Sequence, residues 1–324
     1  MNAPRTTERK VLVIGATGAV GRPVVHLLRQ RGVAVRTLCR RPEAAADLAA
    51  LGAEVVAGDL IDPVSLQRAC RGSTHVLAAA HALLGRGHWR SEAVDDQGHR
   101  ALIVAARDAG VETFVYTSGR GAGPEHPVDF FRTKHRIEQV LKASGLPWVV
   151  LRPTAFMEQH VHQFNGQGLL TGGHIKMIGP GSKRRNFVAA TDVAQVAVRA
   201  LLAELPLFSS FDIAGRDCAS NLEVAGLYAR LSGRPLRISH LPRGAARVIA
   251  TLARPLHPGV ARLMGLLSLL DDAFKEDWDD GAALEREHGV ATTRLEDFVR
   301  ARVAEAGIAQ GAPAAPVRPQ PPAG

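Results

Sequence analysis

VLVIGATGAVGRPVV, residues 11–25, is a short apolar run followed by three glycines at GxxGxxG spacing and then by a second apolar segment. The first run stops at Gly15, which predicts a buried strand that ends in a tight turn. The residues beyond the glycines have helical spacing, and the N-terminus of such a helix offers free N–H groups and partial positive charge to phosphates. The stretch therefore predicts a dinucleotide phosphate cradle. We assign to it Gly15, Thr17, Gly18, Ala19, Val20 and Gly21.

Strand and helix patterns alternate along the first half of the chain. Segments with helical spacing separate the expected strands, and one of them, 62–72, begins with Asp62 and Pro63, which suit an N-cap and a first helical position. This alternation predicts a Rossmann-type, doubly wound parallel sheet covered on both faces. Strands are expected at 10–14, 33–39, 53–59, 74–80, 112–118 and 147–153.

The regular alternation ends near residue 155. We therefore predict an NADP-binding domain at 1–155, with part of 186–215 packing back on it, and a smaller α/β substrate domain at 156–306. Within the latter, 221–275 is expected to be mostly helical and broken by prolines. Residues 307–324 are rich in proline and alanine without periodicity, which predicts a disordered tail.

Composition excludes several classes of protein. The 324 residues are 46% apolar and 22% charged, as in ordinary globular proteins, and no run is long enough to span a membrane. Three widely spaced cysteines without a CxxC pair argue against a disulfide framework or a zinc site. We expect a soluble cytoplasmic protein.

The formal net charge of +9 raises the possibility of nucleic-acid binding. Such binding usually needs basic residues clustered on one face and a recognisable motif, whereas the arginines here are scattered. We expect no nucleic-acid partner and attribute part of the positive charge to binding an anionic dinucleotide.

The end of the second expected strand reads CRRP, with Arg40 and Arg41. An NAD enzyme usually has a carboxylate here against the ribose hydroxyls, whereas guanidinium groups suit the 2′-phosphate of NADP(H). The pattern favours NADP(H) over NAD(H). The alternative is that both arginines are only solvated surface residues.

Several motifs together resemble the atypical short-chain dehydrogenase/reductases, especially the NmrA-like group. The resemblance covers roughly residues 10–215 in the order found in that family. Its pieces are GATGAVG at 15–21, CRRP at 39–42, GDL at 58–60, FVYTSG at 114–119, KHRIEQVLKASGLPWVVLRPTAFME at 134–158 and FVAATDVAQVAVRAL at 187–201.

The resemblance implies roles for individual positions. Lys134 would hold the nicotinamide ribose, and Ser118 would bind a substrate carbonyl, although a serine can also only hydrogen-bond its own loop. The remaining positions would contact the adenine (Asp59, Leu60), the wall along the cofactor (Ala79, Ala80) and the nicotinamide (Pro153, Thr154, Ala155).

Position 130 departs from the family pattern. A tyrosine usually stands four residues before the lysine, but here the residue is Phe130, and neither of the two tyrosines is followed by a lysine at that spacing. The usual phenol acid is therefore missing. General acid catalysis is typically worth about 10²–10⁴-fold, so its loss slows carbonyl reduction without forbidding it. The proton could come from Lys134, His81, solvent or the substrate.

Other side chains complete the expected pocket. His81 and His88 follow the fourth expected strand and can reach the open side of the nicotinamide, and we assign Phe130, Phe156 and His88 to the substrate. Of Glu158, His160 and His162, only the first and last share a helical face, so we expect no metal. The apolar segment 245–274 is expected to line a substrate pocket and pack, rather than bind a membrane.

These observations favour an NADP(H)-dependent reductase acting on a small apolar carbonyl, enone or quinone-like acceptor. The alternative is a non-catalytic NmrA-like sensor of NADP(H). An epimerase-like enzyme is a weaker possibility, since that chemistry usually needs the missing tyrosine. A homodimer is compatible with the sequence, which does not identify the acceptor or the direction of reaction.

Overall fold

The computed structural model describes residues 9–273 and 281–308. The tail predicted at 307–324 lies outside the described residues from position 309 onward. Among the described residues, no helix is both long enough and apolar enough to cross a membrane.

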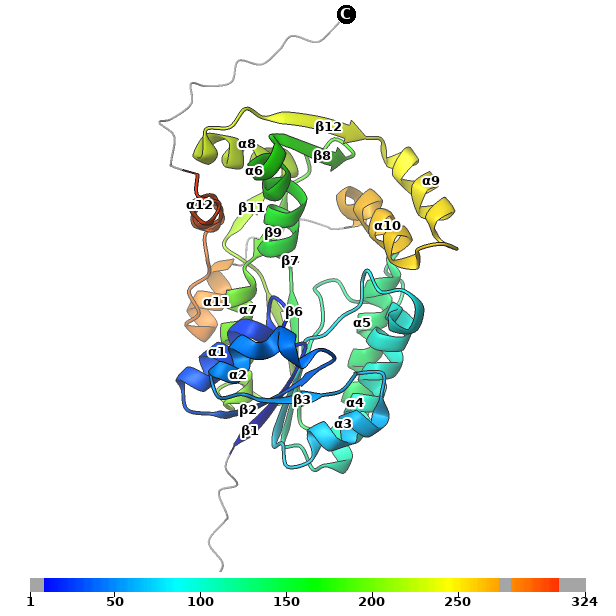
Figure 1. Cartoon of the computed structure of the whole chain (residues 1–324), viewed down its shortest axis with the longest axis vertical. Coiled ribbons are helices and arrows are strands. Elements are labelled where there is room, and N and C mark those ends of the chain that lie inside the picture. The colour runs from blue at the N-terminus through cyan, green and yellow to red at the C-terminus, as the bar shows by residue number, and fades with distance from the viewer. Residues whose placement is uncertain (1–8, 274–280, 309–324) are drawn as a thin grey trace, which may run out of the picture.

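A seven-stranded parallel sheet forms the lower part of the molecule (Figure 1). The strand order is β10-β6-β5-β4-β1-β2-β3. From β1 the chain first adds strands on one side (β2, β3) and then on the other (β4 onward), so the switch point lies between β1 and β4, as in Rossmann folds. The predicted fold class and all six predicted strands are confirmed, and β10 adds a seventh. The strands are Lys10–Ile14 (β1), Ala34–Cys39 (β2), Glu54–Ala57 (β3), His75–Ala78 (β4), Thr113–Thr117 (β5), Trp148–Pro153 (β6) and Ser209–Ile213 (β10).

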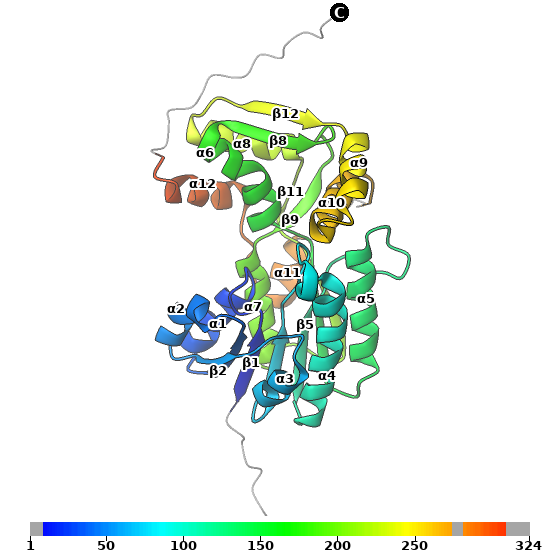
Figure 2. The same ribbon diagram turned by 45° about the vertical axis from the view of Figure 1, so that its right-hand side comes forward.

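Helices cover both faces of this sheet (Figures 1 and 2). One face packs against α1 and α7, and the other against α3, α4 and α5. Asp62 caps α3 as predicted, because its carboxylate accepts from the Val64 N–H at 3.0 Å. The helices of this part are Gly21–Gln30 (α1), Ala46–Ala50 (α2), Pro63–Cys70 (α3), His99–Asp108 (α4), Asp129–Lys142 (α5) and Ala190–Leu201 (α7).

The core follows the period of two that a doubly covered strand requires. In β1, Val11 and Val13 are buried in the cluster under α1 and α7, while Leu12 and Ile14 are buried in the cluster under α3 to α5. The strand is therefore apolar throughout, which is why it stands out in the sequence. Before α4, residues Glu92–Gly98 form a π-helical segment.

A smaller upper part carries two short sheets and several helices (Figure 1). The first sheet pairs β11, β9 and β7, and the second pairs β12 and β8 in parallel. Its elements are Ala155–Phe156 (β7), the π-helical segment Met157–Gly166, Gln167–Gly172 (α6), His174–Ile178 (β8), Arg185–Val188 (β9), Asp217–Ala219 (β11), Asn221–Ser232 (α8), Arg237–Leu241 (β12), Arg243–Ala253 (α9), Pro258–Ala273 (α10), Gly281–His288 (α11) and Leu295–Glu305 (α12).

The strand β12 corrects the expectation of a mostly helical segment at 221–275. Pro235 and Pro242, which we interpreted as helix breaks, flank this strand instead. Its partner β8 lies more than fifty positions earlier, so local periodicity could not identify the pair. The division of the chain into domains near residue 155 stays a prediction.

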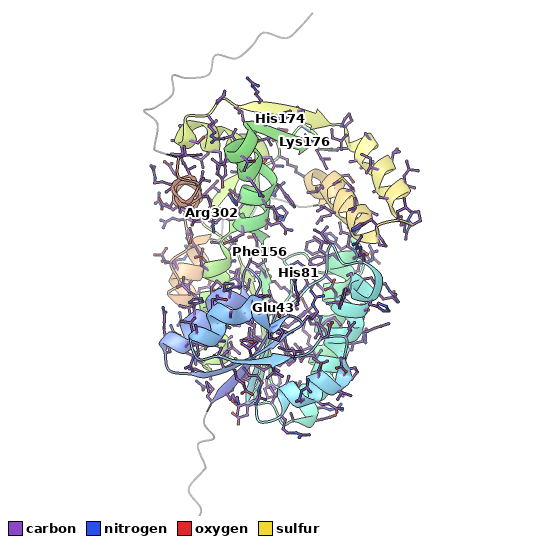
Figure 3. The ribbon with its side chains drawn as sticks, viewed as in Figure 1. Glu43, His81, Phe156, His174, Lys176 and Arg302 are labelled. Carbon is purple, nitrogen blue, oxygen red and sulfur yellow. The ribbon has the colours of Figure 1, made fainter. Side chains whose placement is uncertain are left out.

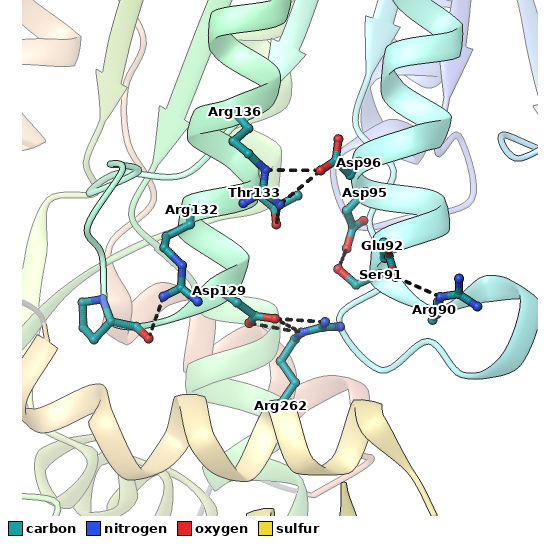
Figure 4. A network of polar contacts seen from close by, with 11 residues as sticks. Arg90, Ser91, Glu92, Asp95, Asp96, Asp129, Arg132, Thr133, Arg136 and Arg262 are labelled. Atoms are coloured by element: carbon teal, nitrogen blue, oxygen red, sulfur yellow. Dashed lines mark hydrogen bonds and ion pairs between the residues drawn. The ribbon is translucent and has the colours of Figure 1, made fainter. Parts of the chain in front are cut away.

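The helix α10 lies over the carboxyl end of the lower sheet, beside α5 (Figure 2). The Arg262 guanidinium contacts the Asp129 carboxylate at 3.0 Å, and Figure 4 shows this bridge from α10 to the first turn of α5. Leu266 of α10 packs with Phe131 and Leu83 in a small apolar cluster. Within the described residues, α10 is thus held against the lower part by an ion pair and by this apolar cluster.

A buried carboxylate connects α5 to two strands. Glu138 is 0% exposed, and its carboxylate accepts from the Ser118 hydroxyl at 2.6 Å and from Arg152 Nε at 3.0 Å. Ser118 directly follows β5, and Arg152 belongs to β6. A buried carboxylate is stable only when it is paired, so this network is expected to stabilise the fold.

We predict that Glu138→Gln lowers the free energy of unfolding by about 3 kcal/mol, because it leaves a partly buried guanidinium without its counter-charge. Denaturant unfolding monitored by circular dichroism measures this. Glu92→Gln is the control, since it breaks an exposed pair with Arg90 and should cost less than about 1 kcal/mol. Equal effects of the two substitutions would contradict the prediction.

Candidate active site

A cleft of about 860 Å³ opens at the carboxyl ends of the parallel strands, where doubly wound sheets bind their ligands. It contains nearly every predicted site residue. Gly21 and His88 do not line it: Gly21 lies at the first turn of α1, and His88 is exposed on a short 3₁₀ turn. The predicted residues that line it are Gly15, Thr17, Gly18, Ala19, Val20, Arg40, Arg41, Asp59, Leu60, Ala79, Ala80, His81, Ser118, Phe130, Lys134, Pro153, Thr154, Ala155 and Phe156.

Steric constraints require glycine at two positions of the cradle. Gly15 has a φ of +85°, and a Cβ there would lie 2.7 Å from the Ala80 nitrogen. A Cβ on Gly21 would lie 2.2 Å from the Gly15 carbonyl oxygen. Both positions therefore require glycine, one for its backbone conformation and both for close approach. The result is a turn that brings the N-terminus of α1 to the edge of the cleft, as a dinucleotide pyrophosphate requires.

One end of the cleft is lined by Arg40, Asp59 and Trp89. The Arg40 guanidinium lies 5.1 Å from the centre of the Trp89 ring. The Trp89 indole N–H donates to the Asp59 carboxylate at 2.7 Å. Trp89 thus connects the two residues predicted to contact the 2′-phosphate and the adenine. Trp89 was not among the predicted site residues, because an exposed tryptophan in a loop has no local signal for such a contact.

Lys134 is buried at the opposite end of the cleft. Only 4% of its surface is exposed, and its ammonium donates to the Thr117 carbonyl oxygen at 2.8 Å. Nζ also lies 4.9 Å from the centre of the Tyr116 ring and 5.5 Å from that of Phe130. Burial lowers the pKa of Lys134 to about 8, although the nearby carboxylates of Asp95 and Glu138 oppose this.

Phe130 and His81 lie close to this ammonium. The two rings meet edge to face, with centroids 6.2 Å apart. His81 is exposed to the open cleft, yet desolvation by the surrounding protein lowers its pKa, and the positive charge of Lys134 lowers it further. His81 is therefore predominantly neutral at pH 7, while Lys134 is predominantly protonated. Figure 3 labels His81 and Phe156 where the lower and upper parts meet.

Ser118 has a different first partner from the predicted one. Its hydroxyl donates a hydrogen bond to the Glu138 carboxylate, and the residue is buried. The oxygen can still accept a hydrogen bond, but it does not offer a free proton to a carbonyl oxygen. Binding of a substrate carbonyl by Ser118 stays a prediction.

The upper wall of the cleft comes from the π-helical segment and from β9. The Glu158 carboxylate accepts from the Ala190 N–H at 3.0 Å and so satisfies the first donor of α7, and burial raises the pKa of Glu158. His160 lines the cleft, and its buried Nδ1 has no hydrogen-bond partner among the described residues. Within the described part of the chain, no three metal-ligating side chains gather. Arg185 and Asn186, which were not predicted as site residues, also line this wall.

A protein-family model described as NAD(P)H-binding matches residues 15–204. An NAD(P)H azoreductase from Xenophilus azovorans is 32% identical over 228 residues, covering 70% of this chain and 75% of that protein. A photosystem II assembly factor, Ycf39, from Guillardia theta is 29% identical over 238 residues, covering 72% of this chain and 73% of that protein.

Solved structures show the same fold. A Citrobacter sp. triphenylmethane reductase superposes with a TM-score of 0.72 at 24% identity, covering 91% of this chain and 99% of that one. An Escherichia coli NADPH-dependent quinone oxidoreductase complexed with NADPH superposes with a TM-score of 0.71 at 23% identity, covering 90% and 99%. At this identity the likeness establishes the fold alone.

The cradle of Gly15 and Gly21, its position at the strand ends and the family match all agree. The predicted resemblance and the predicted nicotinamide cofactor are confirmed: the chain belongs to the NAD(P)H-binding family, in the reductase group that its resemblance to the atypical short-chain reductases indicated.

Proposed function

We propose that this protein is an NADPH-dependent reductase of small, largely apolar carbonyl, enone or quinone-like acceptors. The observation that carries the proposal is the buried Lys134 ammonium, which shares one cleft with the glycine cradle and with Phe130. The azoreductase relative, of which the match covers 75%, is named for a reductase activity, and this supports the proposal.

The residues present fit an NADP(H) cofactor. The cradle would hold the pyrophosphate, Arg40 and Arg41 the 2′-phosphate, and Lys134 the nicotinamide ribose. The bound cofactor supplies a hydride, so each turnover transfers two electrons to the acceptor and leaves NADP⁺. One proton must also reach the acceptor.

Lys134 is the side chain best suited to supply that proton. A pKa of about 8 leaves it mostly protonated at pH 7 yet able to lose its proton, as an acid near neutral pH requires. Its hydrogen bond to Thr117 fixes the ammonium in the cleft. Phe130 cannot donate a proton, and neutral His81 is a weak acid. Solvent would then return a proton to Lys134 after turnover.

The acceptor side of the cleft is largely apolar. Phe130, Phe131 and Phe156 line it, and Leu266 of α10 adds a further apolar side chain. Flat conjugated acceptors suit such walls, because aromatic side chains bury large area and can stack against them. We infer that α10 covers the acceptor and limits the access of water to it.

The second candidate function is a non-catalytic NADP(H) sensor. It is favoured by the hydroxyl proton of Ser118, which is committed to Glu138, together with the phenyl ring at position 130. The assembly-factor relative is named for a role other than reduction. Stopped-flow oxidation of NADPH across quinones, enones and aldehydes distinguishes the two, since tight NADPH binding without oxidation of any acceptor would support the sensor.

Replacing Arg40 should change cofactor choice. We predict that Arg40→Gln weakens NADPH binding about 10- to 100-fold and leaves NADH binding nearly unchanged, because a charge-assisted bond to the 2′-phosphate is lost. Isothermal titration calorimetry with both dinucleotides measures this. Arg31→Gln, an exposed arginine at the end of α1, is the control. Equal losses for both dinucleotides would overturn the assignment.

Trp89 should report cofactor binding. The indole lies between Arg40 and Asp59, so a nucleotide that binds both must change its surroundings. We predict that NADP⁺ changes the tryptophan emission of the wild-type protein and that Trp89→Phe removes most of this change, with the other two tryptophans still present. The same change in both proteins would show that Trp89 does not lie at the nucleotide.

The acid role of Lys134 predicts a pH profile. Because only the protonated ammonium can donate, kcat/KM for the acceptor should fall as pH rises through about 8. Lys134→Gln should lower kcat by about 10²-fold or more and abolish this falling limb. Lys142→Gln, on the same helix, should keep the limb. A flat wild-type profile between pH 7 and 9.5 would contradict the role.

A further inference from the structure

A second cavity of about 550 Å³ lies beside the main cleft in the upper part of the molecule. Gln163 and Arg185 line both spaces, so they form the boundary between them. Phe164 of the second cavity stacks edge to face with His160 of the main cleft, at 5.4 Å between centroids. A π-helical segment carries three of these four residues, and such segments are frequent at functional sites.

Arg185 is a buried cation at this boundary. It is the first residue of β9 and is 5% exposed. Its guanidinium donates to the Asn221 amide oxygen at 2.7 Å and lies 5.2 Å from the centre of the Phe187 ring. These contacts hold the group in one position. A planar guanidinium presents several donors in a fixed geometry that matches the oxygens of carboxylate, sulfonate and phosphate groups.

The charged side chains of the second cavity have one sign. Among the described residues that line it, the ionisable ones are Lys176, Arg185 and His240, and no aspartate or glutamate is present. Lys176 lies on β8 opposite Ser239 of β12, and the parallel register places both on one face of this sheet. Figure 3 labels Lys176 at this upper sheet, above the level of His81. The cavity is therefore suited to an anion.

The same helix borders both spaces. Leu266 of α10 lines the main cleft, while Leu263, Met264 and Leu267 line the second cavity. An acceptor that follows α10 would therefore meet apolar side chains along its length and cations at its far end. The ion pair between Arg262 and Asp129 keeps α10 in position over both.

Building on the proposed reductase function, we propose that the acceptor carries an anionic oxygen group, which reaches the second cavity and binds Arg185 with support from Lys176. Its conjugated part then lies against Phe130 and Phe156. The shared chemistry is a carboxylate, sulfonate or phosphate on a chain attached to the reducible group. Arg185 becomes a specificity-determining residue that selects anionic over neutral acceptors.

The test uses matched acceptors: a 1,4-benzoquinone with a carboxylate-terminated alkyl chain, and its uncharged methyl ester. We expect the wild-type protein to favour the carboxylate by about 10- to 100-fold in kcat/KM. One hydrogen bond to a charged group contributes a binding free energy of that size. Arg185→Gln should abolish this preference, because it should lower kcat/KM for the carboxylate quinone and leave kcat/KM for the ester unchanged. Sulfonate and phosphate analogues on the same chain identify which anion binds best.

Arg184→Gln is the matched control. It removes the same charge one position earlier, from a side chain that is exposed and paired with Glu223, and should preserve the preference. If Arg185→Gln does not fold, Lys176→Gln tests the same cavity from an exposed position, with an expected loss of about 3- to 10-fold in the preference. Equal kcat/KM for both quinones in the wild type, or equal effects of Arg184→Gln and Arg185→Gln, would overturn the inference.

A binding measurement distinguishes a failure of the anion site from a failure of the proposed function. If neither quinone oxidises NADPH in the presence of the protein, the reductase proposal fails. Calorimetric titration of the quinones into the NADP⁺-loaded protein then still tests the cavity. Tighter binding of the carboxylate than of the ester, lost in Arg185→Gln, would support an anion site. Equal binding of both quinones would refute it.

Discussion

Two buried charges on α5 fix the geometry on which the rest of the site depends. Lys134 and Glu138 are one helical turn apart, and both are nearly inaccessible to solvent. The ammonium donates to the carbonyl that ends β5, and the carboxylate accepts from Ser118 just beyond it and from Arg152 of β6. Because an unpaired buried charge is costly, these contacts favour one position of α5 against the ends of β5 and β6. The position of α5 in turn sets the shape of the cleft around Phe130 and Lys134.

This constraint explains what the phenyl ring at position 130 changes. Phe130 lies one turn before Lys134, with its ring 5.5 Å from the ammonium, where a cation–π contact compensates in part for the loss of water around the charge. A tyrosine here would share its proton with the lysine. With phenylalanine, the lysine is the ionisable group of the pair, and burial brings its pKa toward neutrality. Under the proposed reductase function, the acid role therefore passes from position 130 to Lys134.

The sequence predicted the parts of the fold that depend on neighbouring residues. The glycines of the cradle, the six strands and the Asp62 cap each have a local signal, since backbone conformation, period and capping are decided within a few positions. β12 could not be predicted, because its stability comes from pairing with β8 far away in the chain. Trp89 and Arg185 could not be identified either. Trp89 is an exposed tryptophan whose role becomes visible only when the fold places it beside Asp59. Arg185 is one arginine among many until the fold places it between two cavities.

The two halves of the cleft differ in the contacts that build them. The lower half, with its cradle and Lys134, is built from short-range motifs and suits a cofactor that is shared across the family. The upper half is built from long-range pairs, such as Arg185 with Asn221 and α10 with α5. Under the proposed function, the lower half binds the shared cofactor, so the upper half is the part that can distinguish one acceptor from another. Selection of the acceptor is therefore expected to reside in the upper half, where Arg185 is held rigidly and directed by its own contacts.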